Sequence, residues 1–186
     1  MSRASWLVLL VLYAPNLAAQ TVVQPEVPLD SARASVRDAL LVLRDSLGAI
    51  DAAAGRLQRD YRAASGASLT SRARVMAEAC AGSVRTIPPT RTAVSTADAS
   101  NDVRARRRAE LLRALGRLHT ELSRCHVQFT AMAQPGEGEQ VRGYGNDRAV
   151  RILARVREYE RVAGSFLAAM GIKVTPRGAR PRPLAG

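Results

Sequence analysis

The sequence predicts an all-α fold: an up-down-up-down four-helix bundle with coiled-coil-like packing, a short second helix and one disulfide. Three observations predict it. Apolar residues recur at alternating steps of four and three in four segments, which is the spacing of a helical seam. Proline- and glycine-containing stretches separate these segments. No segment of useful length shows the period-two alternation of a half-buried strand.

Residues 1–19 have the order of a secretory signal peptide. Arg3 precedes an apolar run from Trp6 to Ala14, which is followed by Pro15 and Asn16 and then by Leu17-Ala18-Ala19; we expect cleavage after Ala19. The alternative is a membrane anchor, but the run is only half of the roughly 20 residues that a spanning helix needs. We therefore expect no transmembrane anchor after cleavage, a secreted or periplasmic protein, and an extended segment over 20–29.

The first helix is predicted over 31–65, with Asp30 or Ser31 as its N-cap. Gly66 follows, and glycine is the common residue just past a helix terminus. The predicted core face shows strict alternation of four- and three-residue steps, and consists of Val36, Leu40, Leu43, Leu47, Ile50, Ala54, Leu57 and Tyr61.

The second helix is predicted over 69–87, because Pro88 and Pro89 lack the amide hydrogens that a helix interior requires. Residues 88–100 are rich in Thr, Ser, Pro and Ala, so an extended linker is expected there. The predicted core face is Leu69, Ala73, Met76, Cys80 and Val84.

The third and fourth helices are predicted over 101–133 and 146–170, with Asn146 as the N-cap of the fourth. These helices complete a bundle over 30–171. Their core faces are Leu111, Leu115, Leu118, Leu122, Cys125, Phe129 and Met132, and Ala149, Ile152, Val156, Tyr159, Ala163, Phe166 and Met170. Residues 172–186 contain no acidic residue and little apolar surface, and are expected to form a disordered basic tail.

Cys80 and Cys125 are predicted to form a disulfide, since both lie on core faces of an exported chain. The alternative is a pair of buried free thiols. At about 1.5 Å of rise per residue, a tight turn directly after a helix ending at residue 87 would leave the two cysteines about 25 Å apart. We therefore expect the linker to descend along the lower half of the bundle.

The formal net charge is +12, and Lys173 is the only lysine. A basic protein outside the cytoplasm meets anionic lipid, envelope polymers and acidic proteins, so these are the partner classes favoured. Nucleic acid is discounted, because the chain has few aromatic residues for base stacking. A coding bias toward arginine is an alternative explanation of the charge.

No catalytic residue, metal ligand set or cofactor is assigned. His119 and His126 are one heptad apart, about 10 Å along a helix, so they do not ligate one metal together. No serine or threonine has a recognisable histidine and carboxylate partner, and the chain is expected not to be an enzyme.

The candidate anion-binding residues are Arg104, Arg106, Arg107 and Arg108, at the start of the third helix, where positive charge opposes the helix dipole. Beside them, where the second helix is expected to be missing, a groove is predicted between Val36, Leu40, Leu43, Leu111, Phe166 and Met170, unless Ile87 and Val94 fill it. The sequence thus favours an exported bundle that binds an anionic or amphipathic partner at this end. The alternatives are a small exported enzyme or cofactor carrier, and a coiled coil that self-associates into a homo-oligomer.

Overall fold

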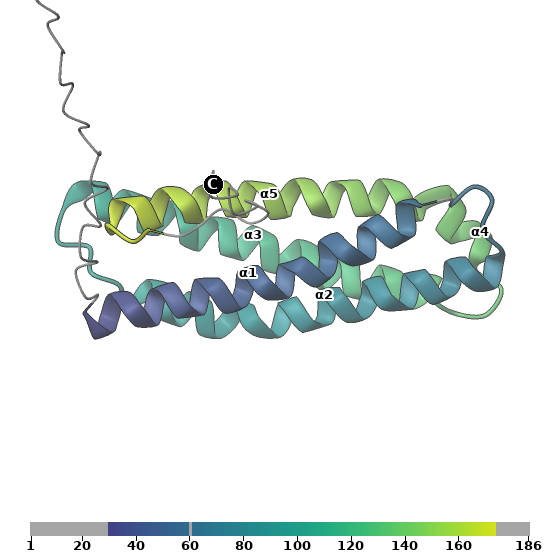
Figure 1. Ribbon diagram of the computed structural model, residues 1–186, viewed down its shortest axis with the longest axis horizontal. Coiled ribbons are helices and arrows are strands. Elements are labelled where there is room, and N and C mark those ends of the chain that lie inside the picture. Colours follow the sequence, from purple (N-terminus) through teal and green to yellow (C-terminus); the bar gives the residue numbers. More distant parts are fainter. Residues whose placement is uncertain (1–29, 60, 174–186) are drawn as a thin grey trace, which may run out of the picture.

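The structure is a computed structural model that describes residues 30–59 and 61–173. Helices α1 (Ser31–Gln58), α2 (Gly66–Ser95), α3 (Asp102–Met132) and α5 (Asn146–Ala169) run the length of the molecule (Figure 1). A short helix α4 (Gly138–Gln140) and a π-helical turn η1 (Val141–Gly145) precede α5. The predicted signal peptide 1–19, the segment 20–29 and most of the predicted tail (174–186) lie outside the described residues.

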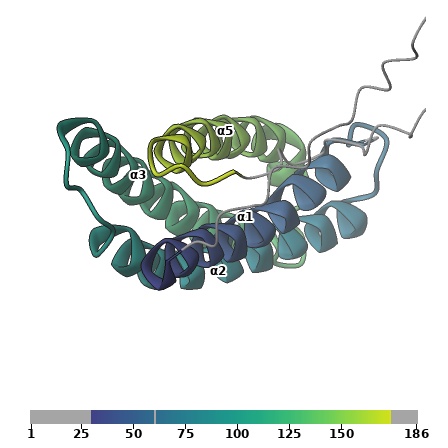
Figure 2. The ribbon, with the colours of Figure 1, turned by 60° about the vertical axis from the view of Figure 1, so that its left-hand side comes forward.

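The all-α bundle is confirmed. Successive long helices run in opposite directions, each packs against its neighbours in the chain, and α1 closes the ring against α5 (Figures 1 and 2). Among the described residues there is no strand, and no helix there combines the length and apolar character needed to cross a membrane.

The predicted seams form the core. Nearly all predicted core positions are buried; Val84 and Tyr61 are half-buried and lie against the core. Leu43, Leu47, Leu118 and Phe166 are wholly inaccessible to solvent. Burial of this apolar stripe, at about 25 cal/mol per Å², provides the main stabilisation of the bundle.

The prediction of a short second helix and an extended linker over 88–100 is wrong. Helix α2 continues through Pro88 and Pro89 to Ser95, and only 96–101 connect it to α3. Both prolines are exposed, so their rings need no room in the core. The seam that begins at Leu69 continues past Cys80 with its steps unbroken, through Ser83, Ile87, Thr90 and Val94.

Hydroxyl groups hold the proline-containing part of α2 in place. Thr86 donates to the carbonyl of Ser83 (2.8 Å) and lies 3.1 Å from the hydroxyl of Ser46 on α1. Thr90 lies 2.8 Å from the carbonyl of Thr86 and 3.2 Å from that of Ala39 on α1. These contacts tie both sides of the proline pair to the neighbouring helix.

Two helix boundaries also differ from the prediction. Helix α1 ends at Gln58 rather than at residue 65, and Ser65 instead caps α2 by accepting from the amide of Ser68 (3.2 Å). Asn146 is not an N-cap, because Gly145 before it already has helical backbone angles, and the helical path begins at Gly138. Gly143 and Gly145 lie within the π-helical turn, so the chain directly before Asn146 is helical and is not a loop.

The C-terminal end of α5 is closed by a Schellman motif. Gly171 has φ of +72°, the amide of Ile172 donates to the carbonyl of Leu167 (2.9 Å), and that of Gly171 donates to Ala168 (3.0 Å). Ile172 is 4 % exposed. The folded part therefore includes residue 172, which the sequence assigned to the tail.

The predicted disulfide between Cys80 and Cys125 is confirmed, with a Cα–Cα distance of 6.1 Å. It joins α2 to α3 in the middle of the bundle. The descending linker is not needed, because α2 itself makes the descent from Cys80 to Ser95 before the chain turns into α3.

Candidate functional site

The four candidate arginines lie in the first turns of α3, where Asn101 caps the helix by accepting from the amide of Arg104 (2.9 Å). Arg104 and Arg108 are half-buried, whereas Arg106 and Arg107 are exposed. The run is thus divided between two faces of the helix, because consecutive residues point in different directions.

Arg104 binds the ends of two other segments. Its Nε donates to the carbonyl of Ala169 at the end of α5 (3.3 Å), and its Nη1 donates to Asp98 (2.8 Å) in the α2–α3 connection. The hydroxyl and amide of Ser100 also donate to Asp98, and together with Arg104 they lower the pKa of this carboxyl. A guanidinium beside the last carbonyls of α5 is favourable for that helix, whose C-terminus carries partial negative charge.

Arg108 has an equivalent role at the end of α2. Its Nη1 donates to the carbonyl of Ala97 (2.9 Å) and lies 3.4 Å from that of Ser95. Arg107 instead pairs with Glu110 (2.8 Å) and lowers the pKa of that carboxyl. Among the described residues Arg106 takes part in no hydrogen bond or ion pair, and it remains open to a partner.

The groove predicted beside these arginines is filled. Its expected walls are buried, with Val36 and Leu40 only 2 % and 3 % exposed. Ile87 and Val94, carried by the continuation of α2, are 2 % and 0 % exposed and occupy the space. At this end of the bundle the described residues therefore present surface arginines, and the space of the predicted groove is packed core.

Arginine also closes the opposite end, which the sequence did not indicate. Arg142 of η1 donates to the carbonyls of Tyr61 (3.1 Å), Arg62 and Ala64 (2.9 Å) in the α1–α2 connection, and it pairs with Glu139 (3.2 Å). Arginine side chains from neighbouring helices thus bind the backbone of both connections that involve α2. This role of Arg142 could not be predicted from the sequence, because its contacts join residues about 80 positions apart.

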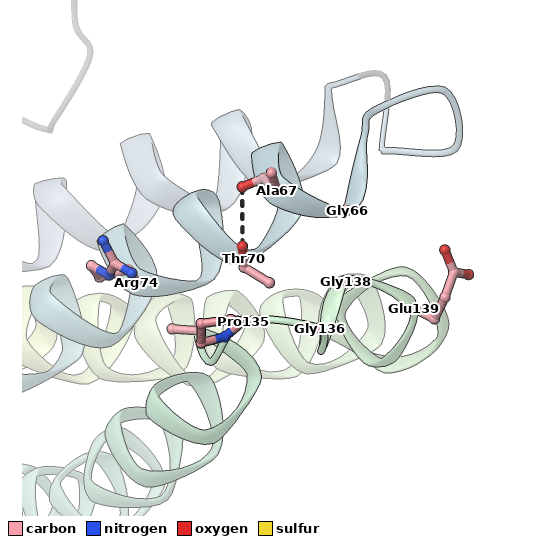
Figure 3. Close-up of a pocket in the computed structure, with 9 residues that line it drawn as sticks. Gly66, Ala67, Thr70, Arg74, Pro135, Gly136, Gly138 and Glu139 are labelled. Atoms are coloured by element: carbon pink, nitrogen blue, oxygen red, sulfur yellow. Dashed lines mark hydrogen bonds between the residues drawn. The ribbon is translucent and has the colours of Figure 1, made fainter.

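A small pocket lies at this end, between the start of α2 and the α3–α4 connection (Figure 3). It holds about 370 Å³ and is lined by Gly66, Ala67, Thr70, Arg74, Ala133, Pro135, Gly136, Gly138 and Glu139. The Thr70 hydroxyl is bonded to the Ala67 carbonyl (3.0 Å), and Arg74 and Glu139 lie at opposite ends of the view. No set of polar groups converges on a point within it.

A second, strongly charged concavity is a groove between α3 and α5, hereafter the α3/α5 groove. It holds about 400 Å³ and is lined by Arg113, Gly116, Arg117, Thr120, Glu121, Arg124 and Arg155. Arg113, Arg117 and Arg124 follow each other at steps of four and seven, so they form one stripe along α3. The spacing of these three arginines can be seen in the sequence, but the contribution of Arg155 on α5 to the same groove cannot.

Carboxylates neutralise only some of the arginines that line the groove. Glu158 of α5 accepts from Arg117 across the groove (2.8 Å) and from Arg155 on its own helix, and these two bonds lower its pKa. Arg124 lies 4.0 Å from Glu121 and its side chain is 68 % exposed. Arg113 is exposed and makes no hydrogen bond or ion pair with any described residue. The groove lining therefore holds four guanidinium groups and one carboxylate, that of Glu121. Glu158 adds a second carboxylate beside the lining, and Arg113 acts electrostatically on Glu110.

Other polar groups do not form a site. The Tyr159 hydroxyl is enclosed in the core without a hydrogen-bond partner among the described residues, and burial raises its pKa, so it stays protonated. The Nδ1 atom of His126 lies 3.3 Å from the carbonyl oxygen of Ala77. Within 30–59 and 61–173, no three His, Cys, Asp or Glu side chains gather in an arrangement that could hold a metal ion.

Comparison with known proteins gives no match: no family model, no curated protein and no solved structure corresponds to this chain.

Proposed function

We propose that this protein is an exported helical bundle, without enzymatic activity, that binds an anionic partner through the α3/α5 groove. The observation that carries the proposal is the arrangement of Arg113, Arg117, Arg124 and Arg155 around one open concavity. Exposed guanidinium groups on the walls of a groove provide charge and paired hydrogen-bond donors for phosphate, sulfate or carboxylate groups.

Export is supported by the signal-peptide pattern of residues 1–19 and by the Cys80–Cys125 disulfide, since disulfides persist in oxidising compartments. The proposed binding surface differs from the arginine run at the start of α3. Arg104 and Arg108 are engaged in closing helix ends and Arg107 pairs with Glu110, so of this run Arg106 is left as an addition to the surface.

The experiment compares two double variants of equal charge. Arg113→Gln with Arg124→Gln removes two charges from the groove, whereas Arg85→Gln with Arg91→Gln removes two from the exposed face of α2. With the residues that the structure describes, none of these four arginines forms an ion pair shorter than the 4.0 Å between Arg124 and Glu121, so folding should be preserved in both variants.

Binding is measured by titration calorimetry of the oxidised protein with three probes: long-chain polyphosphate, dextran sulfate, and phosphatidylglycerol vesicles. We expect at least one probe to bind, and the groove variant to bind it about tenfold more weakly, with a shallower salt dependence, because two anion contacts are lost. The α2 variant should lose about threefold or less. Equal losses in both variants, or no binding of any probe, would overturn the proposal.

A further inference from the structure

We infer that the occupant of the α3/α5 groove is a linear polyanion with closely spaced phosphate or sulfate groups, rather than a membrane surface. This inference rests on the proposed function and specifies its partner. It depends on three features of the groove: the line along which its cations lie, the open floor between them, and the lack of large apolar side chains in its lining.

The cations are spread along a line instead of converging on a point. Arg113 and Arg124 are eleven residues apart on α3, about 16 Å at 1.5 Å per residue. Arg117 lies between them, and Arg155 stands on the α5 side, joined to Arg117 through Glu158. A single free phosphate would contact one or two of these groups, whereas a chain of anions would contact all of them.

The positive charge extends beyond the groove lining to Arg151 of α5. Helices α3 and α5 are antiparallel, and Arg117 of α3 contacts Glu158 of α5. Two turns further along α3, seven residues after Arg117, the chain is therefore level with the position seven residues before Glu158 on α5. These residues are Arg124 and Arg151, both exposed. Two positive charges at one level of neighbouring helices repel each other, and an anionic chain bound along the helices reduces that repulsion.

The floor of the groove is open because residue 116 is glycine. A Cβ added at Gly116 would meet no atom within 4 Å, although Gly in a helix interior costs about 1 kcal/mol relative to Ala. Gly116 lies between Arg113 and Arg117 in the lining, so a thin chain can approach the helix backbone there.

The lining contains no large apolar side chain. An amphipathic partner helix needs an apolar groove for its anchor residues, and a membrane-binding face usually inserts apolar or aromatic groups among its cations. A polymer whose repeating unit is a phosphate or sulfate needs neither, because its binding is dominated by ionic contacts and counterion release.

The test blocks the floor of the groove without changing its charge. Gly116→Gln places an uncharged side chain on the floor and favours helix, so the variant is expected to fold. Gly164→Gln is the matched control, since Gly164 is an exposed helical glycine of α5 with no atom within 4 Å of an added Cβ. Gly116→Ala adds a smaller group at the same place. Circular dichroism checks that all three are folded.

Long-chain polyphosphate is titrated into each variant at physiological salt, with inorganic phosphate and phosphatidylglycerol vesicles as comparison probes. We expect Gly116→Gln to weaken polyphosphate binding about fivefold, Gly116→Ala less, and Gly164→Gln by less than about twofold. Inorganic phosphate should bind far more weakly than the polymer at equal phosphate concentration.

Two results would overturn the inference while leaving the proposed function intact. One is polyphosphate binding that is unchanged in Gly116→Gln although it is lost on removing Arg113 and Arg124. The other is binding to vesicles, at equal accessible charge, that is tighter than binding to polyphosphate. If the groove variant (Arg113→Gln with Arg124→Gln) and the α2 variant (Arg85→Gln with Arg91→Gln) lose polyphosphate binding equally, the proposed function fails as well.

Discussion

The hydroxyl of Thr90, in α2, lies 3.2 Å from the carbonyl oxygen of Ala39, in α1. Thr90 is 2 % exposed and directly follows Pro89, so this contact fixes the helix to its neighbour at the point where two consecutive amide hydrogens are missing. Without such contacts, two prolines inside a helix would break or bend it.

Replacing the prolines tests whether this segment is helical. If residues 88 and 89 are helical, Pro88→Ala and Pro89→Ala each restore an amide donor, and each is expected to stabilise the fold by about 2 kcal/mol. Both side chains are exposed, so little packing is lost. In an extended linker the same changes would destabilise slightly, since the unfolded chain gains freedom. Urea denaturation at neutral pH distinguishes the two signs.

The proline pair also shows where the sequence was insufficient. The seams of α1, α3 and α5 and the first half of the α2 seam were predictable because apolar residues occupy their positions at regular steps. In the last part of α2, however, Ser83 and Thr90 occupy two core positions and two prolines lie between them. The local pattern indicated the end of the helix, and it is outweighed by the packing of Ile87 and Val94 against the other helices and by the contacts of Thr86 and Thr90 with α1.

The sequence showed which residues are candidate arginines, but it did not show which of them stabilise the fold and which are exposed to a partner. Arg104 and Arg106 are two positions apart in one basic run, yet one closes the end of α5 and the other is exposed. The difference depends on Ala169, which is 65 residues away. The α3/α5 groove was missed for the same reason, because the position of Arg155 opposite Arg117 depends on how the helices pair.

Arg104 and Arg106 should therefore respond differently to the same substitution. Arg104→Gln is expected to lower the free energy of unfolding by about 1–2 kcal/mol, because bonds from a charged donor to the Ala169 carbonyl and to Asp98 are lost. Arg106→Gln removes the same charge and should change stability by less than about 0.5 kcal/mol. Similar losses in both variants would contradict the structural role given to Arg104. Chemical denaturation in parallel provides the comparison.

The disulfide closes a loop with a sequence separation of 45 between Cys80 and Cys125. The chain-entropy model assigns about 4 kcal/mol to a loop of this size, so the Cys80→Ala/Cys125→Ala variant should be destabilised by roughly that amount. Both sulfur atoms are in the core, where alanine also leaves unfilled volume. The loss is measured by urea denaturation of variant and oxidised protein. Oxidised protein treated with reductant should unfold at the lower urea concentration found for the variant.

Gly138 and Gly66 approach each other closely where α4 meets the start of α2. A Cβ at Gly138 would overlap the Gly66 backbone, including its carbonyl oxygen at 2.9 Å. Since backbone atoms cannot rotate away, Gly138→Ala is expected to destabilise the fold by about 2 kcal/mol. Gly116→Ala, where the space is open, should instead stabilise by up to about 1 kcal/mol. Thermal unfolding of the two variants gives opposite shifts if this contact is as described.

Glu158 links the stability of the bundle to the charge of the groove. Hydrogen bonds first from Arg155 and then from Arg117 lower its pKa below the ordinary 4.5. A carboxyl whose pKa is lowered by folding stabilises the folded state above its unfolded pKa, and this contribution is lost as the pH falls through the folded pKa. Glu158→Gln should therefore be less stable than the original protein at pH 7, and the difference should disappear at about pH 2.

The same substitution should strengthen binding. Glu158→Gln raises the net charge by one and leaves Arg117 and Arg155 without their shared carboxylate, so both guanidinium groups become available to an anion. We expect polyphosphate affinity at neutral pH to rise about threefold to tenfold, with a steeper dependence on salt. Glu78→Gln, an exposed acid on α2, makes the same charge change away from the groove and should have a smaller effect. A variant that is less stable but binds more tightly would show that Glu158 limits the anion affinity of this surface, whereas unchanged or weaker binding would place the anion elsewhere.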